Sequence, residues 1–343
     1  MSIDKTLGQQ FILKLQLEKI RRYHMGQKIA FASVYNFEPT EDILDKSFNG
    51  YRILPFHVFE SKYNGLVQYL QESNNWLIEP TVPSIPLKYI LIFEGDENTD
   101  VHKLSFRQVL NMFSNTVMYA RLFKTGDIQL GTIFIAEVGR QPIRHPYHTR
   151  FECFMSSVPY EGYRMYPNVY TLNQDEMNDF LGFVKQIEDV PDKKIESFFE
   201  ALYFFDLAKN YHDISSRILN YVIFFERLFL TGTQELKFRL RSYLVFLLKD
   251  PSLTGFIDII YDMRSNVAHS GEVAPAFYRK KYEERHKQAL TMEVINEYIT
   301  RLDNVARQAA RKVLDMIISG TVVNLQDFIT QNNKQFFECL AKK

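Results

Sequence analysis

The sequence predicts an α+β protein in which a mixed α/β N-terminal domain is followed by an all-α helical bundle. Strand-like and helix-like patterns alternate in the first half, whereas from Lys194 onward the strand pattern disappears and apolar residues recur at helical spacing. Pro191, within "EDVPDKK", marks a natural boundary between the two halves. We therefore expect an α+β sensor or substrate-recognition domain at 1–190, a helical bundle at 191–320 and a C-terminal amphipathic helix at 321–343.

The first half contains three β-rich runs and two helical patterns. Ser105 and Gln108 stand at the spacing of a capping box, which predicts that a helix begins there. Asn173 opens the second helix, with Glu176 three residues later. The expected strands are 87–95, 131–139 and 149–158.

The second half contains successive amphipathic helical patterns. Asp250 and Pro251 begin one of them, and Thr291 begins the longest. Together the patterns predict a five-helix, up-and-down bundle. The apolar positions cover about 195–202, 214–225, 236–247, 256–268 and 291–317.

Composition and charge restrict the class of protein. The chain has 343 residues with 41 basic and 41 acidic side chains, so its zero net charge argues against nucleic-acid binding by bulk charge and leaves a local basic patch open. The N-terminal stretch lacks the uninterrupted apolar core of a signal peptide. The most apolar run, 218–230, contains Glu226 and Arg227 and is too short to cross a bilayer. We expect a cytoplasmic protein without a membrane partner.

The cysteines and histidines do not suggest a metal site. Cys153 and Cys339 are the only cysteines and belong to no CxxC or Cys/His cluster. His145 and His148, in "HPYH", have no third ligand nearby. We therefore expect no disulfide framework, metal or cofactor.

The stretch "IIYDMRSNVAHSGE", residues 259–272, carries the candidate catalytic residues. Arg264 and His269 stand at the end of an apolar helical run, just before Gly271. Arg–His pairs of similar spacing occur elsewhere in the chain, but they lie in proline-interrupted or strongly charged segments. A purely structural alternative is a helix C-cap, because cations are favourable at that end of the helix dipole.

This stretch resembles the Arg-to-His motif of the HEPN superfamily, in particular its Apea-like branch. In that branch one helix of the bundle ends in a Tyr, a few residues, Arg-Ser, a short apolar pair and His-Gly. The upstream "SSRILNYVIFFERLFLTGTQELKFRLRSYLVFLL" also resembles the family, and the likeness covers about 194–318. The chain departs from the pattern at Ser270, which separates His269 from Gly271, and at Phe225, where a small residue is commoner.

The resemblance implies a metal-independent endoribonuclease that acts as a homodimer through its bundle, with two copies of the motif forming one composite cleft. Similar proteins cleave tRNA or other RNA in bacterial antiviral defence or toxin systems, and a phage or protein trigger is then a further partner. The alternative is a catalytically inactive HEPN module that dimerises and binds RNA, a nucleotide or a protein.

The chemistry of RNA cleavage suits these side chains. Histidine, with an ordinary pKa of about 6.5, can accept or donate a proton at neutral pH, and the arginine fork suits a phosphate. An ideal helix turns by about 140° over five residues, so Arg264 and His269 share a cleft only if the helix ends or distorts between them. Ser270 and Gly271 make such a distortion plausible.

Three neighbouring residues are candidates for supporting roles. Asn266 could hold the histidine tautomer or bind a phosphate oxygen. Glu226, on another helix, could orient Arg264 or serve only as its structural partner. Ser265 follows Arg264 in the motif.

The segment "FYRKKYEERHKQAL", residues 277–290, combines basic and aromatic side chains that could follow an RNA backbone. The alternative is an ordinary charged, solvated helix. The candidate RNA-binding residues are Arg279, Lys280, Lys281, Arg285 and Lys287.

Overall fold

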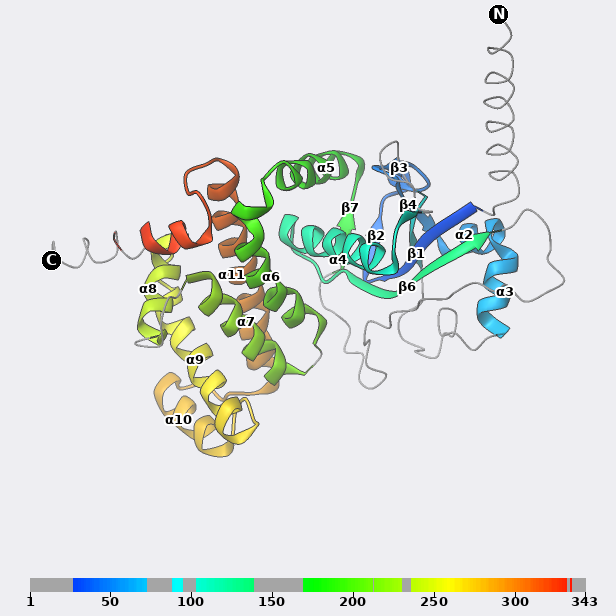
Figure 1. Cartoon of the computed structure of the whole chain (residues 1–343). Helices are drawn as coiled ribbons and strands as arrows, with labels where there is room; N and C mark the ends of the chain where they lie inside the picture. The colour runs from blue at the N-terminus through cyan, green and yellow to red at the C-terminus, as the bar shows by residue number, and fades with distance from the viewer. Residues whose placement is uncertain are drawn as a thin grey trace, which may run out of the picture. The chain divides into compact units, whose positions relative to one another are not determined.

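The structure is a computed structural model that describes residues 27–72, 88–94, 103–138, 169–211, 213–229, 236–331 and 334 (Figure 1). These residues form two compact units. The first comprises the described residues up to Val117, those from Ile128 to 138 and those from Val169 to Gln174; the second comprises Met118–Asp127 and the described residues from Asp175 onward. The predicted α+β class is confirmed.

The first unit is built on an antiparallel five-stranded sheet of order β3-β4-β5-β1-β6. Two of the expected strands are confirmed as β5 and β6, while 149–158 lies outside the described residues. A separate parallel pair joins β2 (Phe37–Pro39) to β7 (Tyr170–Leu172). The five strands of the sheet are β1 (Gln27–Tyr35), β3 (Ser47–Phe48), β4 (Tyr51–Pro55), β5 (Tyr89–Phe93) and β6 (Gln129–Val138).

Strand residues alternate between two faces of the sheet, and apolar side chains are buried on both. Phe31 of β1 packs on Phe59 of α2 (Phe56–Lys62), with ring centroids 5.1 Å apart, and α3 (Asn64–Glu72) contributes Leu66 to the same core. On β4, the Tyr51 ring lies 5.7 Å from that of Phe113 in α4.

The capping box predicted at the start of α4 (Phe106–Phe123) is confirmed. Gln108 Oε1 accepts a hydrogen bond from Ser105 N at 2.9 Å, and Ser105 Oγ accepts one from Gln108 N at 3.4 Å. The two side chains thus satisfy backbone donors that a helix start would otherwise leave without partners.

The second unit is helical beyond Asp175, and the five expected helices are confirmed as α6, α7, α8, α9 and α11. The basic segment forms α10, and 325–331 is a helical part of the expected C-terminal helix. The expected boundary at 190/191 falls between α5 and α6, whereas the compact units divide at Gln174/Asp175. The helices are α5 (Gln174–Glu188), α6 (Asp192–Asn210), α7 (Ile214–Phe229), α8 (Leu236–Leu248), α9 (Leu253–Ser270), α10 (Ala276–His286) and α11 (Met292–Ile318).

The bundle is arranged around α7, which packs against α6, α8, α9 and α11, while α8 also packs against α9. Thr291 caps α11 as expected, since its hydroxyl oxygen accepts a hydrogen bond from Val294 N at 3.4 Å. Among the described helices, none is both long and apolar enough to cross a bilayer.

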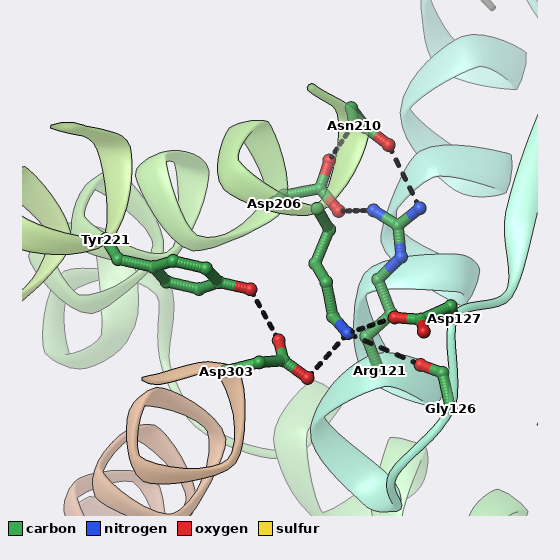
Figure 2. Close-up of polar contacts among 8 residues, drawn as sticks. Arg121, Gly126, Asp127, Asp206, Asn210, Tyr221 and Asp303 are labelled. Atoms are coloured by element: carbon green, nitrogen blue, oxygen red, sulfur yellow. Dashed lines mark hydrogen bonds and ion pairs between the residues drawn. The ribbon is translucent and has the colours of Figure 1, made fainter. Parts of the chain in front are cut away.

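A buried polar network joins four segments of the second unit (Figure 2). Lys209 of α6 donates to Asp127 at 2.8 Å, in the turn after α4, and to Asp303 of α11 at 2.7 Å. The hydroxyl of Tyr221, on α7, also donates to Asp303. These charges are tolerated away from water because each has an oppositely charged or hydrogen-bonding partner.

A second set of polar contacts lies beside the first. Arg121, at the end of α4, is buried and forms an ion pair with Asp206 of α6. It also donates to Asn210 Oδ1 at 2.9 Å, and Asn210 Nδ2 donates to Asp206 at 3.0 Å. The end of α4 therefore belongs to the bundle through its polar contacts as well as its apolar ones.

Candidate functional site

The candidate catalytic residues lie on α9, which continues without interruption to Ser270. Gly271 ends the helix with a left-handed φ of 75°, and its N–H donates to the Val267 carbonyl at 2.9 Å. The expectation of a helix end or distortion between Arg264 and His269 is therefore wrong. The physical reason is that Gly271 is the position where the left-handed conformation costs little, so the helix runs up to it.

Two consequences follow for the geometry of the pair. Five residues on a regular helix separate Arg264 and His269 by about 140° around the axis and by about 7.5 Å along it. Arg264 is half-buried and His269 is exposed. Within one chain, the two side chains therefore start from different sides of α9.

Arg264 is held mainly by an aromatic ring. Its guanidinium carbon lies 5.8 Å from the centre of the Tyr261 ring, three residues earlier on the same helix face. Its Nε is buried without a hydrogen-bond partner among the described residues, a feature shared with Arg217 and Arg239. The contact with the Tyr261 ring, and not a hydrogen bond from Nε, is therefore what positions the Arg264 side chain among the described residues.

Glu226 contacts this arginine through Tyr261. The Tyr261 hydroxyl donates to Glu226 Oε1 at 2.9 Å, which connects α9 to α7. Burial, together with this hydrogen bond and the negative charge of Glu226, raises the pKa of Tyr261 well above its ordinary value, and the Arg264 charge opposes the shift. Among the described contacts Glu226 forms no ion pair with Arg264, so any orienting effect passes through Tyr261.

Tyr261 was not singled out as a site residue from the sequence. Its spacing of three residues from Arg264 could have indicated a contact, because residues three apart on a helix are neighbours on its surface. A tyrosine at that position can place its ring under the arginine and its hydroxyl on another helix.

Asn266 forms part of the turn that follows α9. Its Nδ2 donates to the Val273 carbonyl at 3.3 Å, and its own carbonyl accepts a hydrogen bond from Ser270 Oγ at 2.8 Å. Ser265 and Asn266 precede His269 by four and three residues, so they lie on its side of the helix. The structure thus gives Asn266 a definite structural contact, and no hydrogen bond joins it to His269 among the described residues.

The five candidate RNA-binding residues are exposed, but they do not share one side of α10. Lys280 and Lys281 are neighbours of Phe277 on the helix surface, at spacings of three and four. Arg279 lies on the opposite side, where its Nε donates to the Ala274 carbonyl at 2.7 Å. Arg285 lies in the last turn, and Lys287 follows the helix with a left-handed φ of 55°.

Comparisons of the chain with protein-family models, with curated proteins and with solved structures give no match. The candidate site therefore depends on the geometry of the chain's own residues.

The described residues contain no group of three or more His, Cys, Asp or Glu side chains that could hold a metal ion. His145, His148, Cys153 and Cys339 lie outside the described residues.

Proposed function

We propose that this chain is a metal-independent HEPN endoribonuclease that acts as a homodimer through its helical bundle. The observation that carries the proposal is the pairing, at the end of one apolar helix, of a half-buried arginine held by Tyr261 with an exposed histidine five residues later. The two start from different sides of α9, and each copy supplies a single motif histidine, so a second copy is needed to bring two proton carriers and an arginine into one cleft.

The proposed reaction divides two proton transfers between two histidines. His269 of one copy accepts the proton of the RNA 2′-hydroxyl as that oxygen attacks phosphorus, and His269 of the other copy protonates the departing 5′-oxygen. The bond from phosphorus to the 5′-oxygen breaks, which gives a 2′,3′-cyclic phosphate and a 5′-hydroxyl. Solvent then restores both protonation states.

Arg264 supplies positive charge to the phosphate as negative charge accumulates on it. Such stabilisation requires that the charge be positioned before the reaction. The contacts of Arg264 with Tyr261, and of Tyr261 with Glu226, support this role.

The biological role proposed for the enzyme is cleavage of RNA, with tRNA as one candidate, in bacterial antiviral defence or a toxin system. The N-terminal α+β domain then recognises the RNA substrate or a phage or protein trigger, and the protein acts in the cytoplasm.

The direct test is RNA cleavage by the purified chain with His269→Ala or Arg264→Ala. Loss of a proton-transfer group typically lowers a rate by about 10²- to 10⁴-fold, and loss of one group that stabilises the developing charge by about 10²- to 10³-fold, so we expect either variant to cleave very little while the dimer persists. His286→Ala is the matched control, because His286 is also exposed but stacks on Tyr282 in α10. The wild type should retain activity in chelator and release cyclic phosphate ends; full activity of His269→Ala would disprove the proposed site.

A second candidate function is a catalytically inactive HEPN module that binds RNA, a nucleotide or a protein. Exposed aromatic side chains on the bundle favour it, since Tyr203 is 58% and Phe277 is 67% exposed. A purified dimer that binds one of these partners and cuts no RNA would support this alternative.

A further inference from the structure

The most exposed large apolar side chain of the described residues is Phe277, at 67%. It lies in the first turn of α10. An apolar ring left this open to water gains from contact with another flat, apolar surface.

The rest of α10 fixes the direction of this ring. Tyr278 and Tyr282 are buried on the inner side of the helix. The hydroxyl oxygens of Tyr282 and Tyr298 on α11 are 2.8 Å apart, and Phe256 of α9 stacks on the Tyr298 ring at 6.0 Å. Because these contacts hold the tyrosine side of α10 against the bundle, the side that bears Phe277 faces solvent.

Phe277, Lys280 and Lys281 form one continuous exposed surface, which we call the α10 face. Residues three and four positions after Phe277 are its neighbours on the helix surface. Glu284 lies seven positions after Phe277, and four and three positions after Lys280 and Lys281, so it adds a negative charge to this surface, whereas Glu283 is at neighbouring spacing from Lys280 alone.

Short connections hold the α10 face close in sequence and structure to the end of α9. The turn between the helices is Gly271 to Pro275. Asn266 of α9 donates to the Val273 carbonyl, and Arg279 of α10 donates to the Ala274 carbonyl. Both helices therefore hold the same turn, just beyond His269.

We propose that the α10 face binds an unpaired segment of the RNA substrate, with a base stacked on Phe277 and the adjoining phosphates paired with Lys280 and Lys281. The inference rests on the proposed ribonuclease function. In duplex RNA each base is already stacked and paired, so an exposed aromatic ring finds a free base only in a loop or single strand. In such a strand each base is flanked by two phosphates, so one ring with two lysines beside it can contact a base and both of its phosphates.

The first test measures binding rather than cleavage. In the His269→Ala background, Phe277→Ala should weaken binding of a short, labelled, single-stranded RNA of mixed sequence by about 5- to 140-fold. Binding of the same RNA annealed to its complement should change little. Phe246→Ala is the matched control, because Phe246 is a 45% exposed aromatic residue on α8, and it should have no effect.

The second test separates the ring from the charges. Lys280→Ala combined with Lys281→Ala should reduce the slope of log affinity against log salt concentration by about 1.4, since each phosphate contact of a single strand contributes about 0.7. Phe277→Ala should leave that slope unchanged. Glu284→Gln should strengthen binding, and Glu283→Gln, which removes the same charge from a position beside Lys280 alone, should do so less.

The outcomes distinguish this inference from the proposed function. If binding depends on Phe277 and the wild-type chain cuts no RNA, the RNA-binding role of the α10 face is supported and the proposed ribonuclease function is rejected. If the wild type cleaves RNA, and Phe277→Ala binds RNA as tightly as its parent, the proposed ribonuclease function is supported and the inference is overturned. Equal loss of affinity for single-stranded and duplex RNA in Phe277→Ala would also overturn it, because the ring would then not distinguish an unpaired base from a paired one.

Discussion

Removing the positive charge at the centre of the buried network should destabilise the helical bundle strongly. Lys209 has a side chain only 2% exposed and contacts the carboxylates of Asp127 and Asp303, which are 9% and 14% exposed. Lys209→Met leaves the two carboxylates without this partner. Removing one partner of a buried ion pair costs about 3–5 kcal/mol of unfolding free energy.

A second cation, Arg217, places the expected loss of unfolding free energy near the lower end of that range. Burial alone would lower the pKa of Arg217, but the nearby Tyr221 and the negative charges of Asp303 and Asp127 outweigh it and raise that pKa. Its charge remains in the variant and compensates them in part. We therefore expect Lys209→Met to lower the unfolding free energy by about 3 kcal/mol.

The chain contains a matched control for this measurement. Lys237 also contacts two carboxylates, at 2.7 Å from Asp262 and 3.9 Å from Asp258, but its side chain is 39% exposed. Exposed ion pairs contribute about 0–1 kcal/mol, so Lys237→Met should have little effect. The assay is denaturant unfolding followed by far-ultraviolet circular dichroism, with the transition of the helical unit fitted separately. Equal shifts for the two variants would refute the reasoning, because burial would then not determine the cost.

Three further predictions concern the site and the first unit. When His269→Ala subunits exchange into wild-type dimers, cleavage should fall as the square of the wild-type fraction, whereas a linear fall would show that each chain works alone. Tyr261→Phe keeps the ring under Arg264 and loses the hydrogen bond to Glu226. We therefore expect kcat to fall on the order of tenfold with KM little changed. A Tyr261→Phe/Glu226→Gln double variant that is slower than either single variant would show that Tyr261 and Glu226 act separately. Burial alone would raise the pKa of Glu94, but hydrogen bonds from Tyr63, Arg52 and Lys62 outweigh it and lower that pKa. Glu94→Gln should therefore be less stable than the wild type at neutral pH, and this difference in unfolding free energy should vanish as the pH falls through the lowered pKa. Unfolding curves at several pH values can check this.

The features that could be predicted from the sequence are those encoded by local patterns. The capping box at Ser105 and Gln108, and the N-cap at Thr291, satisfy backbone groups within three residues, so their spacing is sufficient. Apolar periodicity likewise locates the bundle helices. The interior strand β1 was not predicted, because its residues are buried on both faces and lack the alternation of a half-exposed strand.

The features that could not be predicted depend on contacts distant in sequence. Lys209 and Asp303 are 94 residues apart, and a lysine within an apolar helical pattern gives no sign of its partner. The contact between Glu226 and Tyr261 likewise joins two helices. The end of α9 was misjudged for a different reason, because a glycine indicates where a helix stops but not whether the preceding turn is distorted.

The position of Arg264 and His269 on one unbroken helix also constrains how the proposed enzyme becomes active. Arg264 is held through Tyr261 by Glu226, so its position is set within a single copy. His269 is exposed and has no comparable support among the described residues, and one copy supplies only one such proton carrier. Because the reaction needs a base and an acid together, the proposed chemistry begins when two copies meet. Association of the bundles, rather than a rearrangement within α9, is then the step through which a trigger can control cleavage.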